Sequence, residues 1–456
     1  MNAFLRLSPV MRYALGAAVL VVLVVLGNSI WLLSGPGPTD FAGGRPVALA
    51  QYKAADPTGV PGALAHASLV ERGEYLTRAA DCTACHTAQG GTPYAGGLAI
   101  NLPFGTIYST NITPDKETGI GNWTDADFLN AVHRGIGRDG MRLYPAMPYP
   151  SYTYMTDADA LAIKAYLFSL APVHAPGKEI TFGFPFNQRW LMGFWDAFLS
   201  ADKRFEPNAA RSPEWNRGAY IAEALHHCGE CHTPRNIGFA LDNRRKFAGA
   251  LAGGWRSYDI TSDPATGIGA WRDDELFTYL AKGHATGHGT ASGVMGEAVD
   301  ASFSLMAPED IRAIVVYLRS IPAIGSPDLP ARLAPPAPAS PKQGVVASDA
   351  LGKHMFEGAC AACHGWTGVS PVSPFATLTG ARDVNDPSAT NVAQIIISGT
   401  TRKTPDGVIS MPAFGKSFSN IEIAAVANYV TARFGAKPSS VTERDIAGLR
   451  RETAQP

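Results

Sequence analysis

The sequence predicts an all-α protein in which three tandem helical units follow one N-terminal transmembrane helix. Three observations support this prediction. The pentad Cys-x-x-Cys-His occurs three times at wide spacing, a helix signal precedes and follows each copy, and one uncharged apolar stretch lies near the N-terminus. A chain of 456 residues is also long enough for about three or four domains of roughly 100 to 150 residues each.

The apolar stretch from Tyr13 to Leu33 carries no charge and has about the length that a helix needs to cross a bilayer. Arg6 and Arg12 precede it, and basic residues before a span keep that end in the cytoplasm. We therefore predict an anchor in a bacterial inner membrane with the rest of the chain in the periplasm. A cleaved signal peptide is the alternative, since residues 14–26 alone have the length of its apolar region.

Helix signals bracket each pentad. The closing helices have an acidic first turn behind a polar or small residue, which is typical of a helix N-terminus. Tyr166, Tyr317 and Tyr429 occupy matching positions in these closing helices. The opening helices are predicted to begin near Glu71, Asn216 and Leu351, and the closing helices near Thr156, Ala307 and Ser419.

An internal repeat relates the first two units most closely. The frame I-T-x-D-x-x-T-G-I-G-x-W-x-D follows the first and second pentads at nearly the same distance, and it aligns Asp115 with Asp263 and Trp123 with Trp271. Self-similarity at this spacing indicates repeated structural units.

The repeats and the stretches between them divide the chain. We predict an anchor over residues 1–34, a linker over 35–66, and a first unit over 67–175. An aromatic-rich linker over 176–212, a second unit over 213–322, a Pro-rich linker over 323–346, a third unit over 347–436 and a tail over 437–456 follow.

The two long linkers differ in composition. The Pro-rich linker is expected to be semi-rigid and extended, which would let the third unit shift relative to the others. The aromatic linker, with Trp190 and Trp195, is expected to pack between the first two units. The alternative is a patch that contacts a partner or the membrane, because exposed apolar surface is uncommon on soluble faces.

The six cysteines all lie in the three pentads, which leaves none for a disulfide. CxxCH is the attachment motif of c-type haem, in which the two thiols bond to the porphyrin and the histidine binds iron. Structural zinc is the competing interpretation, but the histidine after every second cysteine, the repeated helical frame and the export signal favour haem. We predict three covalent haem c groups in three cytochrome c domains, attached at Cys82, Cys85, Cys228, Cys231, Cys360 and Cys363, with iron on His86, His232 and His364.

The sixth iron ligand is expected to be a methionine before each closing helix, because thioether sulfur raises the potential of a haem. Met147 and Met411 both precede proline, which stiffens the loop that presents the sulfur. The second unit lacks this pair, and we predict Met295, with His284 and His288 as rivals.

Met306 is another methionine of the second unit. It aligns with Met155 at the start of the closing helix, and we expect both side chains to pack in the interior.

Several function classes are excluded by composition and motif content. The formal net charge of -1 gives no general field for binding nucleic acid. No GxSxG, HExxH, Walker or dinucleotide fingerprint is present. A haem with two protein ligands leaves one-electron transfer as its chemistry, although a subunit of a terminal oxidase and a free-standing multi-haem peroxidase remain alternatives.

The chain resembles the tri-haem cytochrome c subunit of bacterial membrane-bound alcohol, aldehyde and gluconate dehydrogenases. The strings that carry the resemblance are RGEYLTRAADCTACHT, YAGGLAI, GTIYSTNITPD, TGIG and LYPAMPYPSYTYMT in the first unit, CGECHTPRN and MGEAV in the second, and ISMPAF in the third. The resemblance covers about residues 71–434 and makes Met147, Met295 and Met411 the distal ligands.

This resemblance also implies a catalytic partner in the periplasm and electron transfer through three haems to ubiquinone in the inner membrane. The partner type is a quinoprotein, a flavoprotein or a molybdenum enzyme. The alcohol dehydrogenase type has an ordinary cleaved leader, whereas this sequence has a predicted anchor. That departure favours the aldehyde dehydrogenase type, in which a molybdopterin subunit and a small iron–sulfur subunit dock on the cytochrome.

Overall fold

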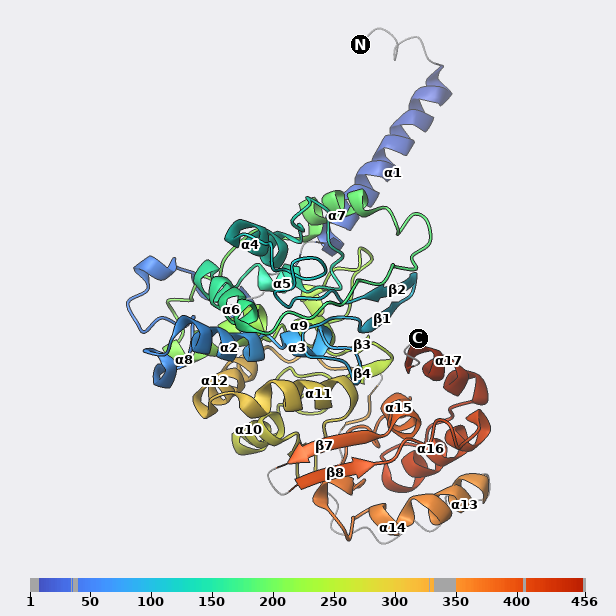
Figure 1. Cartoon of the computed structure of the whole chain (residues 1–456). Helices are drawn as coiled ribbons and strands as arrows, with labels where there is room; N and C mark the ends of the chain where they lie inside the picture. Colours follow the sequence, from blue (N-terminus) through green and yellow to red (C-terminus); the bar gives the residue numbers. More distant parts are fainter. Residues whose placement is uncertain are drawn as a thin grey trace.

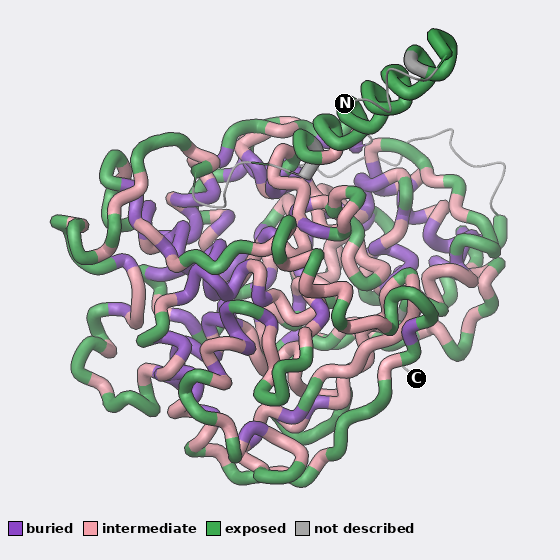
Figure 2. Tube along the Cα trace, turned by 90° about the horizontal axis from the view of Figure 1, so that it is seen from above, coloured by how far each residue is buried: buried purple, intermediate pink, exposed green. Residues whose placement is uncertain are grey.

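The computed structural model of the chain describes residues 8–33, 35, 40–327, 329–331, 350–404 and 407–453. Helices dominate, and α1 (Pro9–Leu33) projects away from the globular part (Figure 1). Within the described residues, Pro9–Trp31 is long and apolar enough to cross a membrane, and none of its most apolar window is buried. Figure 2 shows α1 exposed along its length beside the buried interior of the remaining chain.

A pair of long helices frames each unit. The capping box at the start of the first opening helix, in which Ser68 and Glu71 bond each other's backbone N–H, fixes where that helix begins. Thr156 and Ser419 cap two closing helices through the same type of hydroxyl acceptor. The pairs are α2 (Leu69–Ala79) with α6 (Asp157–Ser169), α8 (Pro213–Tyr220) with α12 (Pro308–Arg319), and α13 (Ala350–Ala359) with α16 (Asn420–Phe434).

Further helices lie between the two members of each pair along the chain. In the first unit these are α3 (Cys82–Cys85), α4 (Asp125–Arg134) and α5 (Tyr149–Tyr152). In the second they are α9 (Gly229–His232), α10 (Asp273–Lys282) and α11 (Gly293–Ala301), and in the third α14 (Ala361–His364) and α15 (Thr390–Ser398). Helix α7 (Met192–Leu199) lies in the aromatic linker.

Each long pair crosses at a glycine that no other residue can replace without moving the helices. A Cβ at Gly73 would lie 1.9 Å from the carbonyl oxygen of Ala162 and 3.0 Å from the Cβ of Tyr166. A Cβ at Gly218 would likewise lie 1.9 Å from the carbonyl oxygen of Ala313, and one at Gly352 would lie 2.2 Å from that of Ala425. The aligned tyrosines Tyr166, Tyr317 and Tyr429 therefore mark the same crossing in all three units.

The prediction of an all-α fold was incomplete, because the described chain also has four two-stranded antiparallel hairpins. Their strands are at most five residues long. The hairpins are β1 (Ala99–Leu102) with β2 (Gly105–Tyr108), β3 (Ala250–Ala252) with β4 (Trp255–Ser257), β5 (His284–Ala285) with β6 (Gly289–Thr290), and β7 (Thr400–Thr404) with β8 (Gly407–Met411).

The first two units share one hydrophobic core, whereas the third unit has a core of its own. Reciprocal hydrogen bonds join the first pair. The hydroxyl of Tyr75 donates to Asp310 at 2.5 Å, and the hydroxyl of the equivalent Tyr220 donates to the equivalent Asp159 at 2.5 Å. Both carboxylates are buried, so each unit supplies one donor and one acceptor to a dry interface.

Arg217 strengthens one side of this interface by a bidentate contact with Asp310 at 2.8 and 2.7 Å. Its Nη1 also donates to the carbonyl oxygens of Pro57 and Gly59. Part of the predicted linker over residues 35–66 is therefore packed on the two-unit interface rather than extended away from it.

The third unit is held against the second by buried hydrogen bonds. Arg402 is 2% exposed and donates to the carbonyls of Ala291 and Gly296 at 3.1 and 2.9 Å, while Gln394 donates to the carbonyl of Gly254 at 2.9 Å. These contacts oppose the shift that the Pro-rich linker led us to expect. Most of that linker lies outside the described residues.

The predicted tail over residues 437–456 contains a helix that the sequence reasoning missed. Helix α17 (Glu443–Thr453) packs on α15 and α16, and Ile446 is fully buried in the third core. In the aromatic linker the packing prediction holds for Phe182 and Phe205, which are buried, but several other aromatic side chains of that stretch face solvent.

Candidate haem sites

Each CxxCH pentad is a single helical turn that follows the opening helix of its unit. In the first, α3 carries Cys82 and Cys85 three residues apart, so both thiols lie on one side of the turn. All six cysteines are free thiols in the structure, five half-buried and Cys363 exposed. This arrangement fits the covalent attachment of one porphyrin edge beside each turn.

The proximal histidines share one hydrogen bond that fixes their ring orientation. The Nδ1 of His86 lies 2.7 Å from the carbonyl oxygen of Thr110, that of His232 lies 2.7 Å from Tyr258, and that of His364 lies 2.6 Å from Ala376. A ring that donates from Nδ1 keeps the lone pair of Nε2 for a metal. Burial also lowers the pKa of all three imidazoles, which favours the neutral form that binds iron.

The repeated sequence frame builds the loop that supplies this acceptor in the first two units. Thr110 and Tyr258 lie two residues before the first isoleucine of the frame. Directly after Thr110, the Asn111 side chain accepts from the backbone N–H of Thr113 at 2.9 Å, and Asp259 accepts from Thr261 at 2.7 Å in the same way. These Asx turns hold the carbonyl beneath the histidine.

Glycine in the TGIG part of the frame is required by close backbone approach. A Cβ at Gly119 would lie 2.3 Å from the carbonyl oxygen of Thr113, and one at Gly267 would lie 2.4 Å from that of Thr261. In both copies the following isoleucine N–H closes the loop at 2.9 Å on the same threonine carbonyl. The sequence repeat therefore reflects a structural repeat, because in both units the frame builds the loop that supports the histidine.

The third unit supplies the acceptor differently. Ala376 ends a short 3-10 helix, Pro374–Ala376, whose first turn is capped by Ser373. This support has no counterpart of the frame, which explains why the sequence repeat weakens there although the histidine bond is retained.

The predicted distal methionines all lie in segments packed against a core. Met147 precedes α5, Met295 lies on α11, and Met411 ends β8; each is half-buried. Met155 and Met306 are instead buried in the shared core, as expected of packing residues.

The two histidine rivals in the second unit have other partners. His288 stacks on Trp271 with ring centroids 3.7 Å apart, and its Nε2 lies 3.2 Å from Glu275. His284 directs Nδ1 to Thr290 at 2.9 Å and packs its ring 4.8 Å from Phe375 of the third unit. The partners of His288 argue against it as an iron ligand, whereas the Nε2 of His284 is buried with no hydrogen-bond partner among the described residues, so His284 and Met295 are both candidates for the second iron.

The pentads of the first and second units face each other across the interface. Tyr152 packs edge-on against His227 at 5.3 Å, and Ser151 donates to Glu230 within the second pentad at 2.8 Å. Burial is the largest cause of the raised pKa of the Cys85 thiol, the carboxylates of Asp81 and Glu297 follow, and Cys231 of the second unit adds a smaller contribution. Sequence reasoning did not identify the contacts of Ser151 with Glu230 and of Tyr152 with His227, because the partners lie far apart in the chain.

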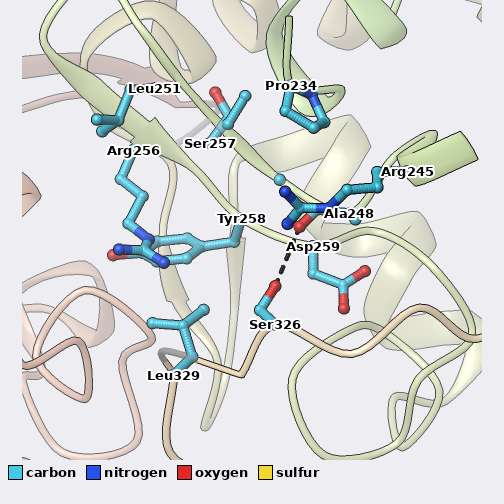
Figure 3. Close-up of a pocket in the computed structure, with 12 residues that line it drawn as sticks. Pro234, Arg245, Ala248, Leu251, Arg256, Ser257, Tyr258, Asp259, Ser326 and Leu329 are labelled. Atoms are coloured by element: carbon cyan, nitrogen blue, oxygen red, sulfur yellow. Dashed lines mark hydrogen bonds between the residues drawn. The ribbon is translucent and has the colours of Figure 1, made fainter. Parts of the chain in front are cut away.

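A pocket lies beside the second site, on its boundary with the third unit. Figure 3 shows Arg256 on one side of this pocket and Arg245 and Asp259 on the other, with Tyr258 between them. The Ser326 hydroxyl donates to the carbonyl oxygen of Ala248 at 3.0 Å. Tyr258 also donates to Asp386 of the third unit at 3.2 Å. The residue that orients His232 therefore also contacts the neighbouring unit.

Structural zinc is disfavoured by the surroundings of the pentads. Across the described residues, no group of three or more His, Cys, Asp or Glu side chains is arranged to hold a metal ion. A tetrahedral zinc site needs such a group, whereas a haem site needs the two thiols and one axial imidazole that each turn provides.

The helix pairs, the CxxCH turns and the oriented histidines together define a c-type cytochrome. Two family models match, one described as cytochrome c over residues 70–171 and one described as cytochrome C oxidase, cbb3-type, subunit III over residues 347–430. Full-length relatives narrow the assignment. The chain belongs to the family of cytochrome c subunits of fructose, gluconate and alcohol dehydrogenases, and it is an electron-transfer cytochrome with covalently bound haem c.

Three relatives illustrate the similarity. The chain is 38% identical to the fructose dehydrogenase cytochrome subunit of Gluconobacter japonicus, over 87% of this chain and 85% of that protein. It is 38% identical to the gluconate 2-dehydrogenase cytochrome c subunit of Pantoea cypripedii, over 86% and 92%. A nicotinate dehydrogenase subunit of Pseudomonas putida is 39% identical over 82% of this chain, which spans only 31% of that longer protein.

Proposed function

We propose that this chain is the tri-haem electron-transfer subunit of a membrane-bound dehydrogenase, accepting electrons from a catalytic partner in the periplasm and passing them to ubiquinone. The observation that carries the haem count is the proximal hydrogen bond, because His86, His232 and His364 each direct Nδ1 to a backbone carbonyl beside a CxxCH turn. Each turn would hold one haem c, which supplies reversible one-electron chemistry.

The distal ligands that we propose are Met147, Met295 and Met411. Position supports them, since each is half-buried on a segment between the pentad and the closing helix of its unit. A haem closed on both faces by protein is suited to electron transfer rather than to peroxide chemistry.

The partner that we propose is a dehydrogenase catalytic subunit oxidising an aldehyde or alcohol, either a molybdopterin enzyme with an iron–sulfur subunit or a quinoprotein. Relatives named as subunits of fructose, gluconate and alcohol dehydrogenases support a dehydrogenase partner. The length and apolar composition of α1 support an N-terminal anchor in the inner membrane. With the basic residues before it, such an anchor would leave the haem units in the periplasm, which is the location that we propose.

The contacts between units support electron transfer between neighbouring units of the chain. The first two pentads face each other, and the His284 ring of the second unit lies against Phe375, the residue before the carbonyl that orients His364. Electrons can therefore pass between neighbouring units without leaving the protein.

The haem count is tested on the full-length protein by pyridine haemochrome assay and intact mass. Replacing Cys228 and Cys231 together by alanine should lower the count from three to two. A count that stays at three, or a wild-type mass equal to that of the bare polypeptide, would refute the assignment.

The function is tested on membranes that contain the complex. Substrate of the copurifying dehydrogenase should reduce the haems, and ubiquinone should reoxidise them. Rapid peroxide turnover by the purified chain with a high-spin haem would instead support a peroxidase, and copurification with a copper–haem oxidase would support an oxidase subunit.

A further inference from the structure

Helix α7 exposes large aromatic side chains along one face. Phe194 is 61% exposed, Phe198 is 79% exposed, and Trp190, in the 3-10 turn that leads into the helix, is 63% exposed. Residues four apart lie on the same side of a helix, so the three side chains form one stripe. Burying such side chains is worth more than burying most others, and their exposure on a soluble face is unusual.

The opposite face of α7 carries its polar side chains and is attached to the protein. Asp196 accepts hydrogen bonds from the hydroxyl of Tyr149 at 2.7 Å and from Arg142 at 2.9 Å, and its side chain is only 12% exposed. Trp195 donates from Nε1 to the carbonyl of Gly238 at 2.6 Å. The helix therefore turns its carboxylate inward and its phenyl rings outward, the reverse of an ordinary surface helix.

The exposed stripe continues onto neighbouring segments. Gly238, which accepts from Trp195, lies between two further exposed apolar residues, and the stretch before α7 contributes a third. We use the name aromatic patch for six side chains that are at least 50% exposed: Phe184, Trp190, Phe194, Phe198, Ile237 and Phe239.

The aromatic patch lies next to the end of α1. The loop that carries Ile237 and Phe239 leads directly into the 3-10 helix Asn243–Arg245. The guanidinium of Arg244 lies 4.2 Å from the centre of the Trp31 ring on α1, and a Cβ added at Gly35 would lie 2.9 Å from the Cβ of Asn243. Figure 1 draws α7 at this same lower end of α1.

The level of the bilayer at this point follows from the length of α1. A helix of 25 residues is about 37 Å long at about 1.5 Å per residue, against a hydrocarbon core about 30 Å thick. Trp31 near its end would lie at the headgroup layer, where tryptophan is enriched. The contact between the Arg244 guanidinium and the Trp31 ring then holds the adjacent loop, and with it α7, at the headgroup layer.

We infer that the aromatic patch is a second membrane contact that inserts into the interfacial layer of the bilayer crossed by α1. This inference rests on the proposed role of α1 as an anchor. The occupant is phospholipid rather than a protein, because the patch is continuous with the end of the spanning helix and presents aromatic rings of the kind that interfacial helices bury among headgroups.

Two contacts restrict the orientation of the globular part, which one spanning helix alone does not. The first and second units would be held close to the membrane, and the third unit would lie at the far end of the molecule from α1 (Figure 1). A fixed orientation keeps the haem units at a constant distance from a membrane-dissolved acceptor.

Nitroxide labels on the full-length haem-loaded protein in phospholipid nanodiscs test this inference. All six native cysteines lie in the haem-attachment pentads, so an introduced cysteine provides one labelling site, which the label stoichiometry checks. The variants are Phe198→Cys in the patch, Val21→Cys in α1 and Val408→Cys, a matched apolar position that is 68% exposed on β8. The readout is collision of the label with oxygen, which partitions into lipid, against a water-soluble nickel chelate.

Labels at positions 21 and 198 should both collide several-fold more with oxygen than with nickel, and the label at 408 should show the opposite. Lipid-like behaviour at 21 with water-like behaviour at 198 would overturn the patch while leaving the anchor intact. Water-like behaviour at both positions would overturn the anchor and the patch together. A label at 198 that becomes shielded from both reagents only when the dehydrogenase partner is added would overturn the lipid contact in favour of a protein contact.

Discussion

Two glycine-to-alanine substitutions on one helix of the third unit are expected to change its stability in opposite directions. Helix α13 contains Gly352 at the crossing and Gly358 with no atom within 4 Å of an added Cβ. Gly358→Ala should stabilise the unit by about 0.5–1 kcal/mol, because alanine loses less backbone entropy in a helix. Gly352→Ala gains the same propensity but places a methyl 2.2 Å from the carbonyl oxygen of Ala425.

The cost at the crossing exceeds the gain. Overpacking costs about 1–3 kcal/mol, and the upper part of that range applies because backbone and the Tyr429 Cβ at 2.9 Å cannot rotate away. After subtracting about 1 kcal/mol of propensity, we expect Gly352→Ala to destabilise the third unit by about 2 kcal/mol.

Hydrogen exchange of the haem-loaded protein, followed by mass spectrometry, measures this locally. Amides of α16 should exchange about 30-fold faster in Gly352→Ala, at tenfold per about 1.4 kcal/mol. They should exchange more slowly in Gly358→Ala, and amides of α2 and α6 should be unchanged in both because the third unit has a separate core. Equal protection in the two variants would refute the close crossing.

Three further predictions concern the first two units. Met147→Ala should lower one haem potential by on the order of 0.1 V, within the ~0.8 V range that axial ligands span, and should remove one sulfur-to-iron absorption band. The packing variant Met155→Leu should keep both the potential and the band. An unchanged redox titration of Met147→Ala would contradict the role of Met147 as a ligand. Burial lowers the pKa of His133 to about 4, so its neutral form contributes stability at pH 7 that is lost as pH falls from about 6.5 towards 4. In denaturant titrations, the free energy of unfolding of His133→Met should fall less steeply with acid than that of the wild type. Identical pH profiles for the two proteins would count against this role of His133. Tyr220→Phe removes a hydrogen-bond donor from buried Asp159 and should lower the free energy of unfolding by about 1–3 kcal/mol. An unchanged denaturant midpoint would contradict this prediction.

Features encoded locally were predictable from the sequence. The CxxCH turns, the capping residues and the I-T-x-D frame are each complete within a few residues, so the sequence showed where the histidines and the long helices lie. The frame also showed that the first two units are more alike than either is to the third. The structure adds the reason, which is the loop that places a carbonyl beneath His86 and His232.

Features that depend on distant partners were not predictable. Tyr75 and Asp310 are 235 residues apart in the chain, and neither side chain has a local pattern that marks it as an interface residue. The hairpins were missed because strands of at most five residues give too little alternation to distinguish from loop. The helix α17 was missed because its charged surface resembles a solvated tail, although Ile446 anchors it.

The three proposed haem sites share one type of histidine hydrogen bond but not one environment, and this difference bears on how a chain of similar cofactors can direct electrons. The first two sites lie against a common core, with their pentads facing each other and their supporting loops fixed by buried Asn111 and Asp259. The third has a separate core, a different support at Ala376 and an exposed Cys363. Burial and hydrogen bonding tune the potential of a haem whose ligands are the same. The His–Met ligation that we propose for all three sites is therefore compatible with distinct potentials, and the asymmetry lies between the third unit and the other two.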